Sequence, residues 1–172
     1  MKITKTWTEE ECIANIDIYV KKFDAGTLVM EDTPLFFSAL FGAIYKSRDE
    51  KEDEDKQELW ENIADDMEEL GTMAYFVVMR DNPHLRYIWK VVPKDFKMME
   101  YEGEYEGLPD VKTNIWMDWV DSVQKDLFAG NPNMSASFFA SDVKVIGSTK
   151  MGAKPRDWVY DFLAYLDREP KA

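Results

Sequence analysis

The stretch from residue 35 to residue 45 constrains the fold most, because it is apolar on nearly every side of a helix. It reads LFFSALFGAIY and follows Thr33-Pro34, where the proline suits the first position of a helix. A helix that is apolar all round must be covered on all sides, or it must line an apolar cavity. The sequence therefore predicts an interior helix and leaves open whether it is simply buried or forms a lid or tunnel wall.

The composition fits one globular domain, or one domain with a helical extension. The chain has 172 residues, of which 45% are hydrophobic, and no apolar run is long enough to span a membrane. Its net charge of −13 disfavours nucleic acids and anionic membranes as partners. The single cysteine excludes an internal disulfide, and neither end carries a recognisable targeting signal, so we expect a cytoplasmic protein.

Residues that usually carry catalysis are scarce in this chain. His84 is the only histidine and falls in an expected turn, while Cys12 fits a buried, small apolar position. A single histidine removes most zinc sites and Ser-His-Asp chemistry. The carboxylates within residues 65–69 are spread around a helix axis, which favours a solvated surface over an acid-base or metal site. The sequence thus predicts no catalytic residue, no metal site, no cofactor and no enzyme activity.

Capping signals predict two further helices in the first part of the chain. Thr8 and Glu11 form a capping box at the start of a helix over residues 9–24. The acidic run 49–58 is expected to begin as a solvated loop and then to supply the negative first turn of a helix. That helix ends at Gly71, which suits the position after a helix end.

After residue 72 the pattern becomes typical of strands. Apolar runs of strand length and alternating apolar and polar residues are separated by short turns. Short turns between neighbouring strands indicate antiparallel pairing. We expect strands over residues 73–80, 85–92, 95–101, 111–115 and 142–147.

Helical spacing returns over residues 116–128, and a short helix and a closing helix are expected over 133–140 and 155–168. The predicted fold class is therefore α+β. It consists of about five strands in a mainly antiparallel sheet, covered on one face by helices, with an N-terminal helical extension. Residues 1–70 are expected to form that helical segment, packed on an α/β domain made of residues 71–172.

Residues 127–147, LFAGNPNMSASFFASDVKVIG, resemble the sterol carrier protein type 2 family. The resemblance lies in the helix end at Gly130, the Asn131-Pro132 turn, an aromatic short helix and a strand of alternating lysine and apolar residues. One departure is Ser141-Asp142, where the family usually has a glycine-lysine pair. The order of elements agrees over residues 70–165, and the resemblance implies a sterol-carrier-like domain with an apolar tunnel between sheet and helices.

This resemblance implies binding, and intracellular transfer, of an apolar ligand such as a lipid, a fatty acyl group or a sterol-like molecule. A tunnel needs bulky, adaptable side chains and no unpaired buried charge. The same side chains would also serve a filled core, so both alternatives stay open. The residues expected to contact the ligand are Trp116, Val120, Leu127, Phe128, Met134, Phe138, Phe139 and Val145.

The acidic segment 49–69 supports a different function, that of a non-catalytic protein-interaction subunit. It holds twelve Asp and Glu residues against Lys51 and Lys56. An acidic helical face of this kind suits a basic protein partner, and self-association as a homodimer is the other expectation.

Overall fold

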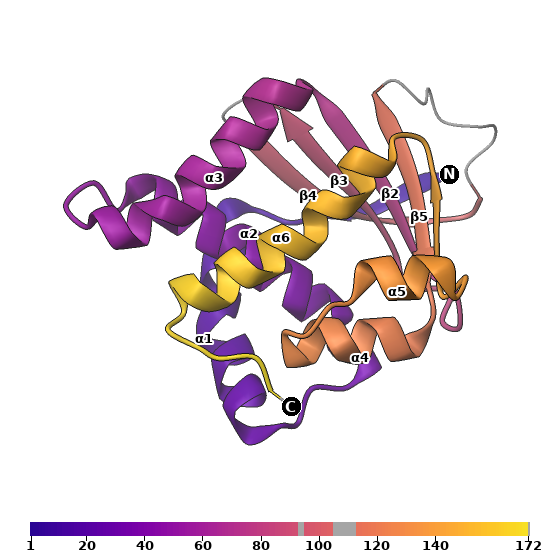
Figure 1. Ribbon diagram of the computed structural model, residues 1–172, viewed down its shortest axis with the longest axis horizontal. Helices are drawn as coiled ribbons and strands as arrows, with labels where there is room; N and C mark the ends of the chain where they lie inside the picture. Colours follow the sequence, from indigo (N-terminus) through magenta and orange to yellow (C-terminus); the bar gives the residue numbers. More distant parts are fainter. Residues whose placement is uncertain (93–94, 105–112, 172) are drawn as a thin grey trace.

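The computed structural model describes residues 1–92, 95–104 and 113–171, and these form the α+β fold that the sequence predicts. Helices cover one face of a single sheet, and the long helix α6 crosses in front of the strands in Figure 1. The helices of the described residues are α1 (Glu9–Ala25), α2 (Thr33–Asp49), α3 (Glu54–Leu70), α4 (Asp121–Ala129), α5 (Met134–Phe139) and α6 (Thr149–Tyr165).

In the described part of the chain the sheet has six strands in the order β1-β4-β3-β2-β5-β6. Neighbouring strands pair antiparallel except β2 and β5, which run parallel with Tyr75 opposite Ile115. The prediction of a mainly antiparallel sheet is therefore confirmed. The strands are β1 (Lys2–Thr6), β2 (Met73–Met79), β3 (Arg86–Val92), β4 (Asp95–Glu102), β5 (Asn114–Trp119) and β6 (Val143–Ile146).

Strand β1 is the strand that the sequence did not predict, and it lies inside the segment expected to be helical. It pairs with β4 at the edge of the sheet, with Lys2 opposite Glu102. Its side chains are mostly exposed, so it lacks the apolar alternation by which a half-buried strand is recognised. The first seventy residues therefore supply a strand as well as helices.

The helix predicted over residues 116–128 is wrong in its first part, where β5 continues as a strand before α4 begins. The side chains of Ile115, Met117 and Trp119 are buried against the helices, and Trp116 lies between them on the opposite face of the sheet. Large apolar residues at these positions fit either period, and hydrogen bonding to β2 settles the strand. Of the strand predicted over 111–115, residues 111–112 lie outside the described residues.

The predicted start of α1 is confirmed at the level of its hydrogen bonds. The Thr8 hydroxyl accepts from the Glu11 backbone N–H at 3.2 Å, and the Glu11 carboxylate accepts from the Thr8 backbone N–H at 2.9 Å. The start of the closing helix is wrong, because α6 begins at Thr149 and contains Pro155. Pro155 resembles a helix start in the sequence, but Ser148 is the true N-cap and accepts from the Met151 backbone N–H.

Helix α2 lies between the sheet and the other helices and is buried from Phe36 to Tyr45. The Phe37 ring packs edge-on against Trp89 of β3, with ring centroids 4.7 Å apart. On its other side α2 approaches α1 so closely that a Cβ on Gly42 would collide with the Cys12 backbone. The apolar run therefore forms a buried helix, and its residues and those of the sheet belong to one core cluster.

Candidate ligand-binding pocket

An apolar pocket lies where α5, β6 and the first half of α6 meet. Its volume is about 210 Å³. Most of its walls are aliphatic or aromatic, and one charged residue, Arg156, reaches it from α6. Its lining consists of Met134, Ser135, Phe138 and Phe139 of α5, Val143 and Val145 of β6, and Thr149, Gly152, Ala153 and Arg156 of α6.

Local sequence explains why these three elements meet here. The Asn133 side chain accepts from the Ala136 backbone N–H at 3.1 Å and so begins α5 directly after the Asn131-Pro132 turn. Gly152 lets α6 pack closely on β6, because a Cβ at this position would lie 2.9 Å from Val145 Cγ1. The glycine therefore sets the spacing between one wall of the pocket and its floor.

The pocket brings together four of the eight residues that the sequence predicts as ligand contacts. Met134, Phe138, Phe139 and Val145 all line it. Met134 is buried, whereas Phe138 is 43% exposed and Phe139 is 86% exposed. The pocket therefore runs from a buried methionine to an aromatic rim at the surface.

The other four predicted contacts lie elsewhere. Leu127 and Phe128 of α4 are buried in the main core, and Val120 is the N-cap of α4 and packs against that core. Trp116 packs on the far face of the sheet, in a small cluster with Phe76. These four residues do not line the pocket, and the helix wrongly expected at 116–128 is the reason that Trp116 and Val120 were grouped with it.

Residues that the sequence reasoning missed come mainly from the first turns of α6. Thr149, Gly152, Ala153 and Arg156 line the pocket, but the predicted helix began only at residue 155. The signal for them was Ser148, an N-cap residue directly after the last strand. Val143 of β6 also lines the pocket and was not among the predicted residues, although it alternates with Val145 on the same side of the strand.

The space between the sheet and the helices, where the sequence suggests a tunnel, is occupied by side chains of α2. The Phe36 ring packs edge-on against Phe128 of α4, with centroids 5.6 Å apart, and tilted against Phe37 at 5.5 Å. Phe37 in turn contacts Trp119 of β5 at 6.3 Å. The aromatic side chains between α4, α2 and the sheet therefore pack on one another, and the pocket lies beside this interior.

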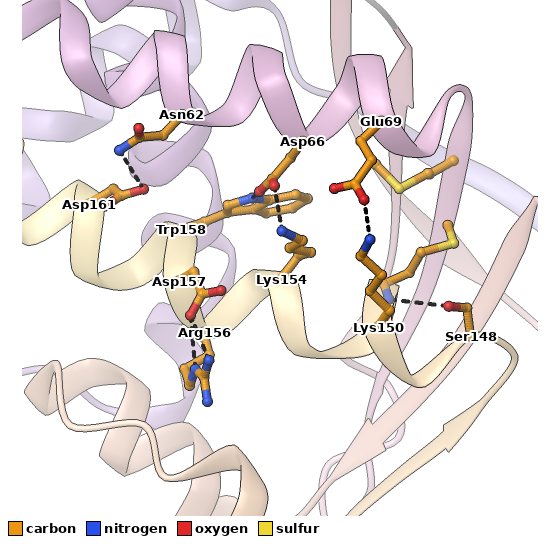
Figure 2. A network of polar contacts seen from close by, with 12 residues as sticks. Asn62, Asp66, Glu69, Ser148, Lys150, Lys154, Arg156, Asp157, Trp158 and Asp161 are labelled. Carbon is orange, nitrogen blue, oxygen red and sulfur yellow. Dashed lines mark hydrogen bonds and ion pairs between the residues drawn. The ribbon is translucent and has the colours of Figure 1, made fainter.

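The side of α6 that faces away from the pocket is joined to α3 by polar contacts (Figure 2). Asp66 of α3 pairs with Lys154 and accepts from the Trp158 indole N–H at 3.1 Å. Glu69 pairs with Lys150 one turn earlier on α6. These contacts fix the helix whose other side forms the pocket wall.

Asp161 of α6 lies in the same contact between α3 and α6, and the pKa of its carboxyl is raised. Partial burial raises the pKa of its carboxyl above the ordinary range, and the neighbouring carboxylates of Asp157, Glu58 and Asp66 raise it further. A hydrogen bond donated by the Asn62 amide at 3.3 Å acts in the opposite direction. The ionised Asp161 is therefore an unfavourable element in this contact.

Groups that would suggest other chemistry are not assembled in the described residues. No group of three or more His, Cys, Asp or Glu side chains there is arranged to hold a metal ion. Burial, followed by the charge of Glu11, raises the pKa of the Cys12 thiol to about 12, so the thiolate form that a nucleophile requires is disfavoured. Within the same residues, no helix is long and apolar enough to cross a membrane.

Comparisons with known proteins give likenesses of structure. No protein-family model and no curated protein matches the chain. A solved structure described as UbiJ-SCP2 Ubiquinone synthesis protein is similar with 14% identity and a TM-score of 0.44, over 63% of this chain and 80% of that chain. The apo form of Sterol Carrier Protein 2 from Yarrowia lipolytica is similar with 15% identity and a TM-score of 0.43, over 72% of this chain and 89% of that chain.

The descriptions of both structures carry the name of the family that residues 127–147 resemble. At this level of identity the likeness concerns the fold alone. What the pocket binds has to be inferred from the residues of this chain.

Proposed function

We propose that this protein is a non-catalytic carrier that binds the apolar part of a small molecule in the pocket between α5, β6 and α6. The observation behind the proposal is the combination of an apolar pocket with an exposed aromatic rim. An isolated exposed apolar residue needs no explanation, but Phe138 and Phe139 lie side by side at the mouth of a cavity. Contact with an apolar ligand would remove both from water.

The size of the pocket limits how tightly an apolar group alone would bind. At about 210 Å³ it is smaller than the roughly 300–1,000 Å³ of sites for drug-sized ligands, so only part of a lipid would fit. Burial of about five methylenes contributes roughly 4 kcal/mol, and after the cost of association this allows a Kd of about 1 mM or weaker. Apolar contact supplies weak, reversible binding, which suits a carrier that must also release its ligand.

Flexible side chains in the lining would allow the pocket to bind more than one related ligand. Met134 closes the inner end of the pocket, and its unbranched side chain can repack around different shapes. Phe139, at the outer end, provides a surface through which an apolar ligand would enter from a lipid-like donor. We therefore extend the proposal to transfer of a lipid, fatty acyl or sterol-like ligand in the cytoplasm.

Filling the pocket from α6 tests the proposal. Ala153 is half-buried and lines the pocket, so Ala153→Phe would occupy its volume. Ala164→Phe is the matched control, because Ala164 lies on the same helix, is exposed and does not line this pocket. Isothermal titration calorimetry with octan-1-ol should show an affinity that is lower by at least about tenfold in Ala153→Phe and unchanged in Ala164→Phe. Equal binding by all three proteins would place the ligand elsewhere and refute the proposal.

The outer face of α3 supports a second candidate, the protein-interaction subunit. Glu61, Asp65 and Glu68 are exposed there, and none forms an ion pair with another described residue. A lysine-rich peptide would be the probe, titrated at physiological salt because surface electrostatics are screened within about 8 Å. Loss of binding on replacing these three carboxylates by the corresponding amides would favour this function, and unchanged binding would exclude that face.

A further inference from the structure

Two lysines face each other on the side of the sheet that the helices leave uncovered. Lys90 of β3 and Lys97 of β4 are directly opposite in the antiparallel ladder, so their Cα atoms lie about 5 Å apart. Both residues are exposed, and neither forms an ion pair with another described residue. Like charges in directly opposite positions destabilise a sheet, and an acidic group placed between the two lysines would remove this cost.

The alternation of side chains along the strands shows which face carries the lysine pair. Lys90 points to the same face as Ile88, and Lys97 to the same face as Met99. Ile88 and Met99 belong to the small cluster around Phe76, whose members all come from strands. The helices pack in the larger core cluster on the other face. Among the described residues, no helix therefore covers the lysine pair.

The charge of this uncovered face differs in sign from that of the whole chain. The alternation and the cross-strand register place four cations and two carboxylates of the described strands on it, a net charge of +2, whereas the chain carries −13. These residues are Arg86, Lys90, Lys97 and Lys144 against Asp95 and Asp118. An acidic surface therefore meets less repulsion here than the net charge of the chain implies.

The outer face of α3 carries the complementary charge. Glu61, Asp65 and Glu68 are exposed, and their spacing of four and three residues places them on one side of the helix in successive turns. Successive turns are about 5.4 Å apart, close to the distance between residues on neighbouring strands. A helix that lies across the strands therefore brings two of its carboxylates opposite Lys90 and Lys97 at once.

A second copy of the chain can supply that helix, whereas the same copy cannot. Helix α3 belongs to the helical layer and packs on the face of the sheet opposite to the lysine pair (Figure 1). The contact is therefore head-to-tail, with α3 of one copy against the sheet of the next. It leaves the apolar pocket untouched, because neither α3 nor the lysine pair lines that pocket.

We propose that the protein associates head-to-tail with further copies of itself, through a contact between the acidic face of α3 and the lysine pair of the sheet. This inference rests on the second candidate function, in which α3 is an interaction surface, and it names the partner. It does not depend on the carrier function. Exposed ion pairs contribute little one by one, so the association is weak and reversible. Each contact leaves both surfaces free at the two ends, so a row of copies can grow at high concentration.

Sedimentation equilibrium of the full chain over a range of concentrations, in roughly 0.15 M salt, measures the association. We expect the average mass of the unmodified protein to rise with concentration above that of one chain. Reversal of the lysine pair by Lys90→Glu with Lys97→Glu should weaken association by at least about tenfold, because attracting charges become like charges. Reversal of the helix face by Glu61→Lys, Asp65→Lys and Glu68→Lys should have the same effect.

The two reversed proteins together provide the decisive measurement. In an equimolar mixture each reversed surface meets a surface of opposite charge on the other variant, so association should return. A chain that carries all five changes should also associate with itself, for the same reason. Association of neither the mixture nor the fivefold variant would overturn the inference.

Matched controls separate the contact from the effect of net charge. Lys21→Glu with Lys125→Glu changes the charge as much as reversal of the lysine pair does, at exposed residues of α1 and α4. Asp17→Lys with Glu31→Lys and Asp126→Lys is the corresponding control for the carboxylates, again at exposed residues. Both controls should associate as the unmodified protein does, and loss of association in them equal to that in the reversed proteins would overturn the inference.

The failure of this inference can be told from the failure of the function on which it rests. A protein that stays monomeric at every concentration would overturn the head-to-tail contact. If α3 of that monomer still binds the lysine-rich peptide, the interaction function stands with a different partner. If α3 binds neither the peptide nor a second copy, the inference and the second candidate function are both refuted.

Discussion

Two Phe-Phe pairs, one on α2 and one on α5, differ in how far their side chains are exposed to solvent. Phe36 and Phe37 are each 1% exposed, whereas Phe138 and Phe139 are 43% and 86% exposed. The dipeptide is the same, and the difference lies in what surrounds each helix. Helix α2 has the sheet on one side and α1, α3 and α6 on the others, while α5 is a helix of six residues that packs on β6.

The comparison teaches that aromatic content alone does not distinguish a closed interior from a binding surface. Around α2 each ring finds other rings at centroid distances of about 5–6 Å, and the interior is filled. Around α5 the Phe138 and Phe139 rings contact each other at 6.0 Å and then border a pocket. One pair is part of the core, and the other is exposed and lines a pocket.

Removal of the first seventy residues is expected to have the largest effect. A chain of residues 71–172 would lose α2 and with it the partners of Trp89 and Phe96 on the sheet. We expect no cooperative unfolding transition and no near-ultraviolet circular dichroism from such a chain. A cooperative transition would instead show that residues 71–172 fold as an independent domain with α2 as an accessory cover.

Truncating one ring from each pair tests the comparison directly. Phe37→Ala should lower the free energy of unfolding by about 3–5 kcal/mol, because it leaves a cavity among packed rings. Phe139→Ala should change it by less than about 0.5 kcal/mol, as expected of an exposed position, and should weaken octan-1-ol binding. Urea denaturation measures the first effect and titration the second. Similar losses of stability in both variants would contradict the assignment of α5 to a binding surface.

The spacing of α6 and β6 gives a smaller, local effect. Gly152→Ala would place a Cβ 2.9 Å from Val145 Cγ1, and relieving this overlap should lower stability by about 1–3 kcal/mol and alter the pocket. Val145→Ala in the same chain removes the colliding methyl groups, so the double variant should recover part of the loss. Additive losses in the double variant, measured by thermal unfolding, would show that the two side chains do not meet.

The smallest expected effect is that of Asp161→Asn, on the side of α6 that faces α3, on the free energy of unfolding. Since the folded state raises the pKa of Asp161, its ionised form opposes folding above that pKa, and this penalty disappears as the pH falls through it. Asp161→Asn should therefore raise the free energy of unfolding at pH 7 by less than about 1 kcal/mol. The gain should shrink as the pH is lowered into the range where aspartate becomes protonated. A gain that is independent of pH would mean that the carboxylate charge is not its cause.

Much of the fold was predictable because it follows local rules. The capping box of Thr8 and Glu11, the proline start of α2 and the alternation of β3 each carry their own signal. The errors fall where a longer-range partner decides the structure. Trp116 becomes part of a strand through pairing with β2, and β1 exists only because β4 lies beside it.

The pocket was only half predictable for the same reason. Its α5 and β6 residues lie in one short stretch of sequence, and Met134, Phe138, Phe139 and Val145 were identified there. Its α6 wall depends on how closely that helix approaches the strand, which Gly152 makes possible and which no periodicity reveals. Arg156 belongs to the same wall, and nothing among its neighbours in the sequence marks it as a lining residue.

The pairing of β1 with β4 has a consequence for the kinetics of folding. Lys2 cannot pair until the chain around Glu102 is in place, and β2 pairs with β5 across the whole length of chain that holds β3 and β4. Contacts between residues so distant along the chain require costly loop closure, which slows folding. The β3–β4 hairpin is therefore the expected nucleus of the sheet, with both edge strands added late, so the floor of the pocket on β6 would be among the last parts to form.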